Sequence, residues 1–286
     1  MRYTYFPGCS LQCSARDYDQ SARAVMGALG VEMAELNDWN CCGGGAVSSV
    51  EPDLALAFSA RNLSLAEETG NDIAVSCAAC YTNLRRARAV VTGKTAAAKR
   101  LRESLADINR KVTGASQVKH LLEIIVNDIG LNAINAAVQK PLTGLKVAAY
   151  YGCQMGRPAG SFVHPEMPHE LDDLVAALGA EPVAWKGKVR CCGATTMVTK
   201  EEAAAGLVDR LLSDAEAAGA QLIATACPLC HMNLDAYQAT VNRHRGKAHR
   251  MPVVYFTQLM ELAMGRQPDL SLAFVPAEPV IRGVVR

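Results

Sequence analysis

The chain has no long apolar run and no strong charge of either sign. Its longest apolar stretches, such as Val147–Tyr151 and Leu222–Ala226, are far shorter than the ~20 residues of a membrane-spanning helix. The first ten residues lack an apolar core of signal-peptide length. Lysine and arginine number 29 against 28 acidic residues, a balance that gives no indication of nucleic-acid binding. We therefore expect a cytoplasmic protein without a transmembrane segment or a nucleic-acid partner.

Two common cofactor signatures are also missing. The sequence contains no compact C-x-x-C-x-x-C run of the ferredoxin type and no G-x-G-x-x-G nucleotide fingerprint. The Gly43-Gly44-Gly45 stretch lacks the lysine and hydroxyl residue that complete a phosphate-binding loop, so we expect it to wrap a neighbouring group. The chain should carry neither an ordinary ferredoxin cluster nor a flavin.

What the chain does have is eleven cysteines, ten of which form one pattern that occurs twice. In each half, a single cysteine is followed by an adjacent pair with glycine and then by a C-x-x-C, and the gap between the pair and the C-x-x-C is identical. The ten are Cys9, Cys41, Cys42, Cys77 and Cys80, then Cys153, Cys191, Cys192, Cys227 and Cys230. In a reducing compartment such cysteines are thiols or metal ligands rather than a disulfide framework.

The repeat extends beyond the cysteines. Leu29-Gly30-Val31-Glu32 matches Leu178-Gly179-Ala180-Glu181, and each C-x-x-C is followed at the same spacing by Asn-Leu. Ordered matches of this kind indicate a gene duplication. We predict two homologous units, residues 1–140 and 145–286, joined by the turn-rich segment between them.

Each half alternates short β-rich runs with helical patterns. The predicted strands are Arg2–Phe6, Ile73–Ser76, Lys146–Tyr151 and Leu222–Ala226; the predicted helices are Ala15–Leu29, Asp53–Glu68, Glu170–Leu178 and Glu201–Ala218, with an extra charged helix over Thr95–Val112. This order predicts an α/β fold, with parallel sheets flanked by helices and the two units related by pseudo-two-fold symmetry. Because α/β sheets place ligands beyond the strand carboxyl ends, the five cysteines of each half should gather there.

Soft thiolates in sets of five favour iron–sulfur chemistry. Zinc takes four ligands in a tetrahedron, which would leave one thiolate over in each half. Two alternatives stay open at this point: zinc in one site with a cluster in the other, and redox-active thiols without metal.

On these ten cysteines, and on Cys191-Cys192-Gly193 and Cys227-Pro228-Leu229-Cys230-His231, the chain resembles the B subunit of heterodisulfide reductase, a family built of two CCG domains. The resemblance covers nearly the whole chain. It implies two non-cubane 4Fe-4S clusters on the ten cysteines, and cleavage of a small-molecule disulfide to two thiols, or the reverse. It also implies two partner subunits of the same complex, one ferredoxin-like and one flavin-containing.

The chain departs from this family pattern at one position. Gln154 follows Cys153, where methanogen members are expected to carry histidine, so the substrate need not be the methanogen heterodisulfide. Similar proteins occur in heterodisulfide-reductase-like complexes of sulfur-oxidising bacteria. The alternative functions are an electron-transfer subunit of a membrane-associated or sulfur-oxidising complex, without disulfide chemistry, and a zinc-stabilised scaffold.

Several residues outside the repeat are further candidates. His231 could protonate a product thiolate or support the ligands around it. His120 is expected on an apolar helical stretch as a structural histidine, and Cys13 as a buried spare thiol. Two basic groups are expected to be solvated or to attract acidic partners or an anionic substrate: Arg85, Arg86 and Arg88, and Lys186, Lys188 and Arg190.

Overall fold

The computed structural model describes residues 1–158 and 160–283, so the last three residues of the predicted second unit, 284–286, lie outside the described residues. Two parallel sheets of four strands have the same order. The first runs β2 (Glu32–Glu35), β1 (Arg2–Phe6), β3 (Ile73–Val75), β4 (Val118–His120), and the second runs β6 (Glu181–Pro182), β5 (Lys146–Tyr150), β7 (Leu222–Thr225), β8 (Val253–Tyr255). The predicted α/β fold with two equivalent sheets is confirmed.

Helices connect the strands in both halves. The first half contains α1 (Cys9–Gln12), α2 (Arg16–Ala28), α3 (Ala46–Val50), α4 (Pro52–Glu67), α5 (Ala78–Val91), α6 (Ala96–Ala106), α7 (Leu121–Glu123), the π-helix η1 (Ile124–Gly130) and α8 (Leu131–Ala137). The second contains α9 (Glu170–Ala177), α10 (Glu201–Ala217), α11 (Pro228–Asp235), α12 (Gln238–Arg245), α13 (Phe256–Ala263) and α14 (Glu278–Arg282). The charged helix predicted over 95–112 is present in shorter form as α6.

Burial explains why the central strands form where they do. β3 and β7 are buried along their whole length, and their Ile/Ala/Val and Leu/Ile/Ala residues suit a parallel sheet covered on both faces. In register, Thr4 pairs with Ile73 and Val147 pairs with Leu222. Since all strands of a sheet run parallel, their carboxyl ends meet along one edge.

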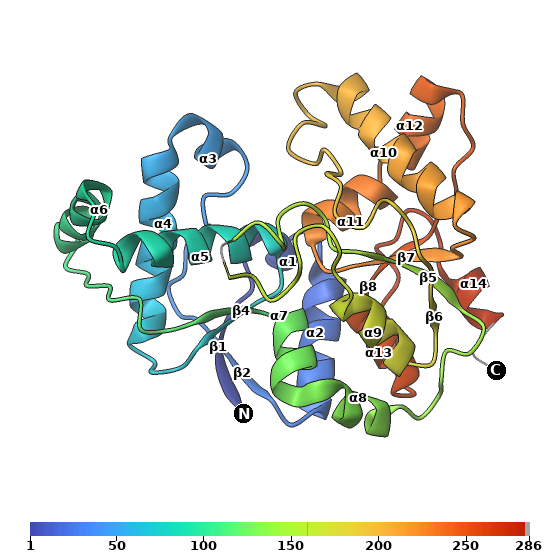
Figure 1. The fold of residues 1–286 in the computed structure, drawn as a ribbon, viewed down its shortest axis with the longest axis horizontal. Coiled ribbons are helices and arrows are strands. Elements are labelled where there is room, and N and C mark those ends of the chain that lie inside the picture. The colour runs from blue at the N-terminus through green and yellow to red at the C-terminus, as the bar shows by residue number, and fades with distance from the viewer. Residues whose placement is uncertain (159, 284–286) are drawn as a thin grey trace.

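The two halves pack against each other through helices that belong to opposite units. Figure 1 shows α2 of the first half beside α13 of the second, and these two helices are in contact, as are α8 and α9. Across the first of these contacts Tyr18 stacks on Tyr255 with ring centroids 4.1 Å apart, and the hydroxyls of Ser21 and Thr257 lie 2.6 Å apart. The buried apolar side chains of both halves therefore form a single core.

The expectation for His120 is wrong in one respect. His120 does not lie on a helix: it is the last residue of β4 and the N-cap of α7. Its Nδ1 accepts a hydrogen bond from the backbone N–H of Leu122 at 3.1 Å, and this contact turns the chain from strand into helix. The apolar run Leu121-Leu122 continues directly after it, which hid the boundary in the sequence pattern.

Candidate metal centre

The strand ends bring the dispersed cysteines together. Cys9 and Cys153 follow β1 and β5, and Cys77 and Cys227 follow β3 and β7 and form the N-caps of α5 and α11. The adjacent pairs lie in the loops after β2 and β6. In the first half Cys9 and Cys41 are exposed, whereas Cys42, Cys77 and Cys80 are buried; the second half has the same gradient, with Cys153 half-buried. The five cysteines of each half therefore gather at the predicted edge of their sheet.

Glycine is required where the backbone approaches the thiols. Gly8 and Gly152, the residues before Cys9 and Cys153, have φ of +74° and +69°. A Cβ at either position would lie 3.0 Å from a sulfur, Cys80 Sγ or Cys230 Sγ. Both the positive φ and the close approach exclude larger residues, so these glycines shape the floor of the two sites.

The sulfur atoms form an almost continuous series across the molecule. Cys192 Sγ and Cys230 Sγ lie 3.5 Å apart. Neighbouring thiols also act on one another's pKa in the pairs Cys9 and Cys41, Cys41 and Cys42, Cys42 and Cys80, Cys80 and Cys77, Cys77 and Cys227, Cys227 and Cys230, and Cys153 and Cys191. The pair Cys77 and Cys227 joins the two sets of five. The two candidate sites are therefore direct neighbours.

Three thiols have a lowered pKa: Cys41 and Cys191, the outer members of the adjacent pairs, and Cys227, through interactions with Cys230 and Cys77. Hydrogen bonds from the thiols of Cys42 and Cys9, and from the N–H groups of Gly43 and Gly44, lower the pKa of Cys41 to about 2. The thiol of Cys153 and the N–H of Gly193, 3.3 Å from Cys191 Sγ, lower the pKa of Cys191 to about 6, and Arg157 acts in the same direction. Thiolate is the form that binds metals.

A cavity of about 110 Å³ is lined by all five cysteines of the second half. Gly44, Ala78 and Ala79 of the first half close its other side. Five converging thiols around a small space provide a donor set that fits an iron–sulfur cluster. Among residues 1–158 and 160–283, no three His, Cys, Asp or Glu side chains are arranged as a site for one metal ion.

An asparagine three residues after each C-x-x-C holds the adjacent pair. Asn233 Nδ2 donates to the carbonyl of Cys192 at 2.5 Å, and Asn83 Nδ2 lies 3.5 Å from the carbonyl of Cys42. The Cys42 carbonyl also accepts from Ser59 Oγ at 2.8 Å. In the second half, one short hydrogen bond therefore holds the carbonyl of the inner cysteine. In the first half, two donors share that role.

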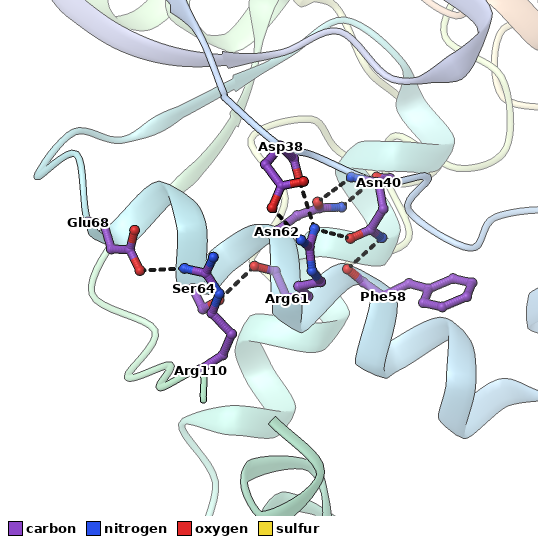
Figure 2. Close-up of polar contacts among 8 residues, drawn as sticks. All are labelled: Asp38, Asn40, Phe58, Arg61, Asn62, Ser64, Glu68 and Arg110. Carbon is purple, nitrogen blue, oxygen red and sulfur yellow. Dashed lines mark hydrogen bonds and ion pairs between the residues drawn. The ribbon is translucent and has the colours of Figure 1, made fainter. Parts of the chain in front are cut away.

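A polar network fixes the segment that leads into Cys41 (Figure 2). Asn62 is fully buried on α4; it accepts from the N–H of Asn40 at 3.0 Å and donates to its carbonyl at 2.8 Å. Arg61 donates to the carbonyl and carboxylate of Asp38 and to the side chain of Asn40. The side chain of Asn40 donates in turn to the carbonyls of Cys41 and Phe58. Helix α4 therefore determines where the first cysteine pair lies.

Two buried side chains lie between equivalent points of the halves. Since Nδ1 of His120 is an acceptor, its Nε2 carries the hydrogen; it donates to the carbonyls of Ser76 and Ala226, both at 3.1 Å. The Tyr18 hydroxyl lies 3.0 and 3.5 Å from the same two carbonyls. These carbonyls directly precede Cys77 and Cys227. Burial lowers the pKa of His120 to about 4, so the ring is neutral and structural, as expected.

The structure places His231 away from the thiol-lined cavity. Its Nε2 donates to the carbonyl of Val253 at 3.0 Å, and its ring stacks on Tyr255 at 4.2 Å. Burial lowers the pKa of His231 to about 4, which makes it a poor proton carrier near neutrality. This geometry favours the supporting role over proton donation.

Other candidates behave differently from expectation. Cys13 is exposed, not buried; it is the C-cap of the single-turn helix α1, just before α2. Lys188 and Arg190 are paired with Asp172 and Asp214, so neither is available to attract a substrate anion. Arg85, Arg86 and Arg88 do not form a simple solvated face, since all three line a cavity with Arg157.

Comparison with known proteins assigns the chain to a family. The model of the CCG cysteine-rich domain matches residues 3–85 and 147–235, once in each half. The chain therefore belongs to the CCG family, in duplicated form. A structure of a hypothetical protein from Helicobacter pylori has the same fold, with a TM-score of 0.76 at 13% identity over 96% of this chain; the chain spans about half of that protein (52%).

Relatives that match over more than 90% of both chains indicate the function more closely than the domain match does. The chain is 30% identical to the B subunit of the ferredoxin/F420H2-dependent CoB-CoM heterodisulfide reductase of Methanosarcina acetivorans, covering 94% of this chain and 91% of the relative. It is 32% identical to the 8-methylmenaquinol:fumarate reductase membrane anchor subunit of Wolinella succinogenes, covering 92% of both chains. Together with the CCG match, these relatives support an iron–sulfur reductase subunit that works within a complex. No helix in the described part of the chain has the length and apolarity to span a bilayer.

Proposed function

We propose that this chain is the catalytic iron–sulfur subunit of a heterodisulfide reductase or reductase-like complex. In this role it cleaves a disulfide to two thiols, a step that consumes two electrons and two protons, or it performs the reverse oxidation. The observation that carries the proposal is that the two sets of five thiols meet at Cys77 and Cys227. The carbonyls directly before these cysteines both accept from His120 Nε2 at 3.1 Å, and the two thiols act on each other's pKa.

The ten repeated cysteines would hold two non-cubane 4Fe-4S clusters, one in each half. When bound, such a pair can supply one electron each and iron positions for the product sulfurs. Zinc in one of the two sites is the substitute to be tested. The residues that line the cavity beside the thiols would then contact the substrate and hold the surrounding loops in place.

Ala78, Ala79 and Leu229 line the thiol-lined cavity and keep water from its walls. Gln154 lines it as well, and its backbone carbonyl accepts a hydrogen bond from Thr82 Oγ1 at 2.8 Å, which ties the loop after Cys153 to α5. Because both halves contribute to this boundary, a disulfide held there would be in reach of both sets of ligands.

Electrons and protons must come from outside the chain. We propose two partner subunits in the same complex, one ferredoxin-like and one flavin-containing, since no flavin or ferredoxin motif is present in the sequence. Protons would come from solvent, because His231 is buried against Tyr255. A cytoplasmic location is part of the same proposal.

Iron, zinc and acid-labile sulfide should be measured on the anaerobically purified chain, followed by viologen-dependent reduction of disulfides. Two four-iron clusters require about eight irons per chain. Cys42→Ser and Cys192→Ser should each lose turnover, with Cys13→Ser as the matched control. Full turnover in either variant would contradict disulfide cleavage at this centre.

A second candidate is an electron-transfer subunit of a membrane-associated complex that performs no chemistry on sulfur. The similarity to the membrane anchor subunit of the Wolinella enzyme favours it specifically. Flotation of the cluster-loaded chain with lipid vesicles, together with quinol oxidation in the absence of disulfide turnover, would select this function over the first.

A further inference from the structure

A second cavity, of about 480 Å³, lies beside the metal centre. We call it the arginine cleft, because Arg85, Arg86 and Arg88 of α5 and Arg157 of the loop after Cys153 line it. Thr82 and Gln117 add a hydroxyl and an amide to its wall. Among the described residues that line the cleft there is no aspartate or glutamate, so its walls present positive charge and hydrogen-bond donors.

Three of these arginines, Arg86, Arg88 and Arg157, form no ion pair within the described part of the chain. Arg86 and Arg157 are exposed, and the side chain of neither forms a hydrogen bond with the described residues. Arg88 is held through Nε, which donates to the carbonyls of Gly114 and Ser116 at 2.9 and 3.0 Å. That contact fixes its guanidinium without compensating its charge.

Other arginines without an ion pair to the described residues, such as Arg210, line neither the cleft nor the thiol-lined cavity, so the cleft is distinguished by four arginines around one space. Several arginines elsewhere are compensated. Arg61, Arg110 and Arg190 each pair with a carboxylate, of Asp38, Glu68 and Asp214 respectively. Guanidinium groups gathered around one concave space repel one another unless an anion binds between them. Arginine is also the side chain best suited to grip phosphate, sulfonate or carboxylate through paired hydrogen bonds.

The arginine cleft and the thiol-lined cavity share two structural elements. On α5, Ala79 and Asn83 face the thiols, whereas Thr82 and Arg86 line the cleft. On the loop, Cys153 and Gln154 line one cavity and Arg157 lines the other. The bond from Thr82 to the Gln154 carbonyl forms part of the wall between them.

We propose that the arginine cleft is a binding site for a small polyanion, a molecule that carries two or more phosphate, sulfonate or carboxylate groups. Its volume lies within the ~300–1,000 Å³ of small-molecule sites. Binding there does not depend on which reaction the metal centre performs, so it can be tested apart from turnover.

The test is isothermal titration calorimetry of the cluster-loaded chain in dilute Tris chloride, with sulfate and propane-1,3-disulfonate as probes, because both bind iron weakly. Propane-1,3-diol is the neutral control. The double variant Arg86→Ser/Arg157→Ser removes two exposed cations, and Arg210→Ser, at an exposed position on α10, is the matched control. We expect saturable binding of the disulfonate that weakens about tenfold or more in the double variant and is unchanged in Arg210→Ser.

Absence of saturable binding, or equal affinity in the double variant, would overturn the proposal. Competition distinguishes the source of the anion. Displacement by 3,3′-dithiodipropionate at a much lower concentration than by suberate, the dicarboxylate of equal length with methylenes in place of the two sulfurs, would mean that the cleft holds the charged end of a disulfide. Equal displacement by the two dicarboxylates would identify a separate anionic ligand, and both outcomes support the site.

Discussion

Asn233→Ala should damage the metal centre far more than Asn83→Ala, although the two residues are equivalent in the repeat. Asn233 is 2% exposed and its side chain donates to the Cys192 carbonyl at 2.5 Å. In the described structure no other side chain donates to that carbonyl. The carbonyl of Cys42 keeps its 2.8 Å bond from Ser59 when Asn83 is removed.

The magnitudes follow from this difference. Loss of a buried donor leaves a carbonyl without a partner, which costs about 1–3 kcal/mol, and the vacated volume adds to the cost. We therefore expect Asn233→Ala to destabilise the protein by roughly 2–4 kcal/mol. For Asn83→Ala the lost bond is long, at 3.5 Å, and its acceptor stays satisfied, so roughly 0.5 kcal/mol is expected.

The assay is thermal denaturation of both variants after anaerobic purification, with iron per chain measured in parallel. At about 2–4 °C per kcal/mol, Asn233→Ala should lower the Tm by about 4–16 °C and Asn83→Ala by less than about 2 °C. The iron deficit of Asn233→Ala should be confined to one cluster. Equal shifts in the two variants would refute the reasoning, since they would mean that the Ser59 bond does not compensate.

Three further changes test other parts of the structure. Asn62→Ala removes both bonds that hold the Asn40 backbone, so it should cost roughly 2–4 kcal/mol and lower the iron content. Asn132→Ala, at an exposed position on α8, should do neither in the same melting and iron assays. His120→Ala removes a donor shared by both halves and should lower the Tm by about 4–10 °C; an unchanged melting curve would show that Tyr18 alone suffices. Cys13→Ser should keep the wild-type iron content, because Cys13 is exposed and outside the repeat; a loss measured by iron analysis would make it a ligand.

The sequence predicted the parts of this structure that depend on local pattern. The β-rich runs and helix-ending glycines placed β1, β3, β5 and β7 within a residue, and the rule for strand carboxyl ends predicted where Cys9 and Cys77 would meet. The unit boundary at 140–145 and the roles of the ten cysteines as cluster ligands stay predictions.

Features that depend on packing between the halves could not be predicted. The position of His120 at a strand end is set by carbonyls of Ser76 and Ala226, which are distant in sequence. The arginine cleft needs α5 and Arg157 to face each other, and no sequence spacing encodes that distance. The exposure of Cys13 depends on where the chain runs after the single-turn helix α1. Hydrophobic periodicity along the sequence does not predict this.

His120, which lies between the halves, also shows how the two repeats have diverged. At two equivalent positions the repeat carries tyrosine and histidine in exchanged order: Tyr81 with His120 in the first half, His231 with Tyr255 in the second. The one pair of carbonyls between the halves, of Ser76 and Ala226, is contacted by one histidine, His120, and one tyrosine, Tyr18, both from the first half. Two copies of the first half would bring two imidazoles to one pair of carbonyls, and two copies of the second would bring none. A symmetric dimer of either half would therefore lack the single shared donor that the fused chain has.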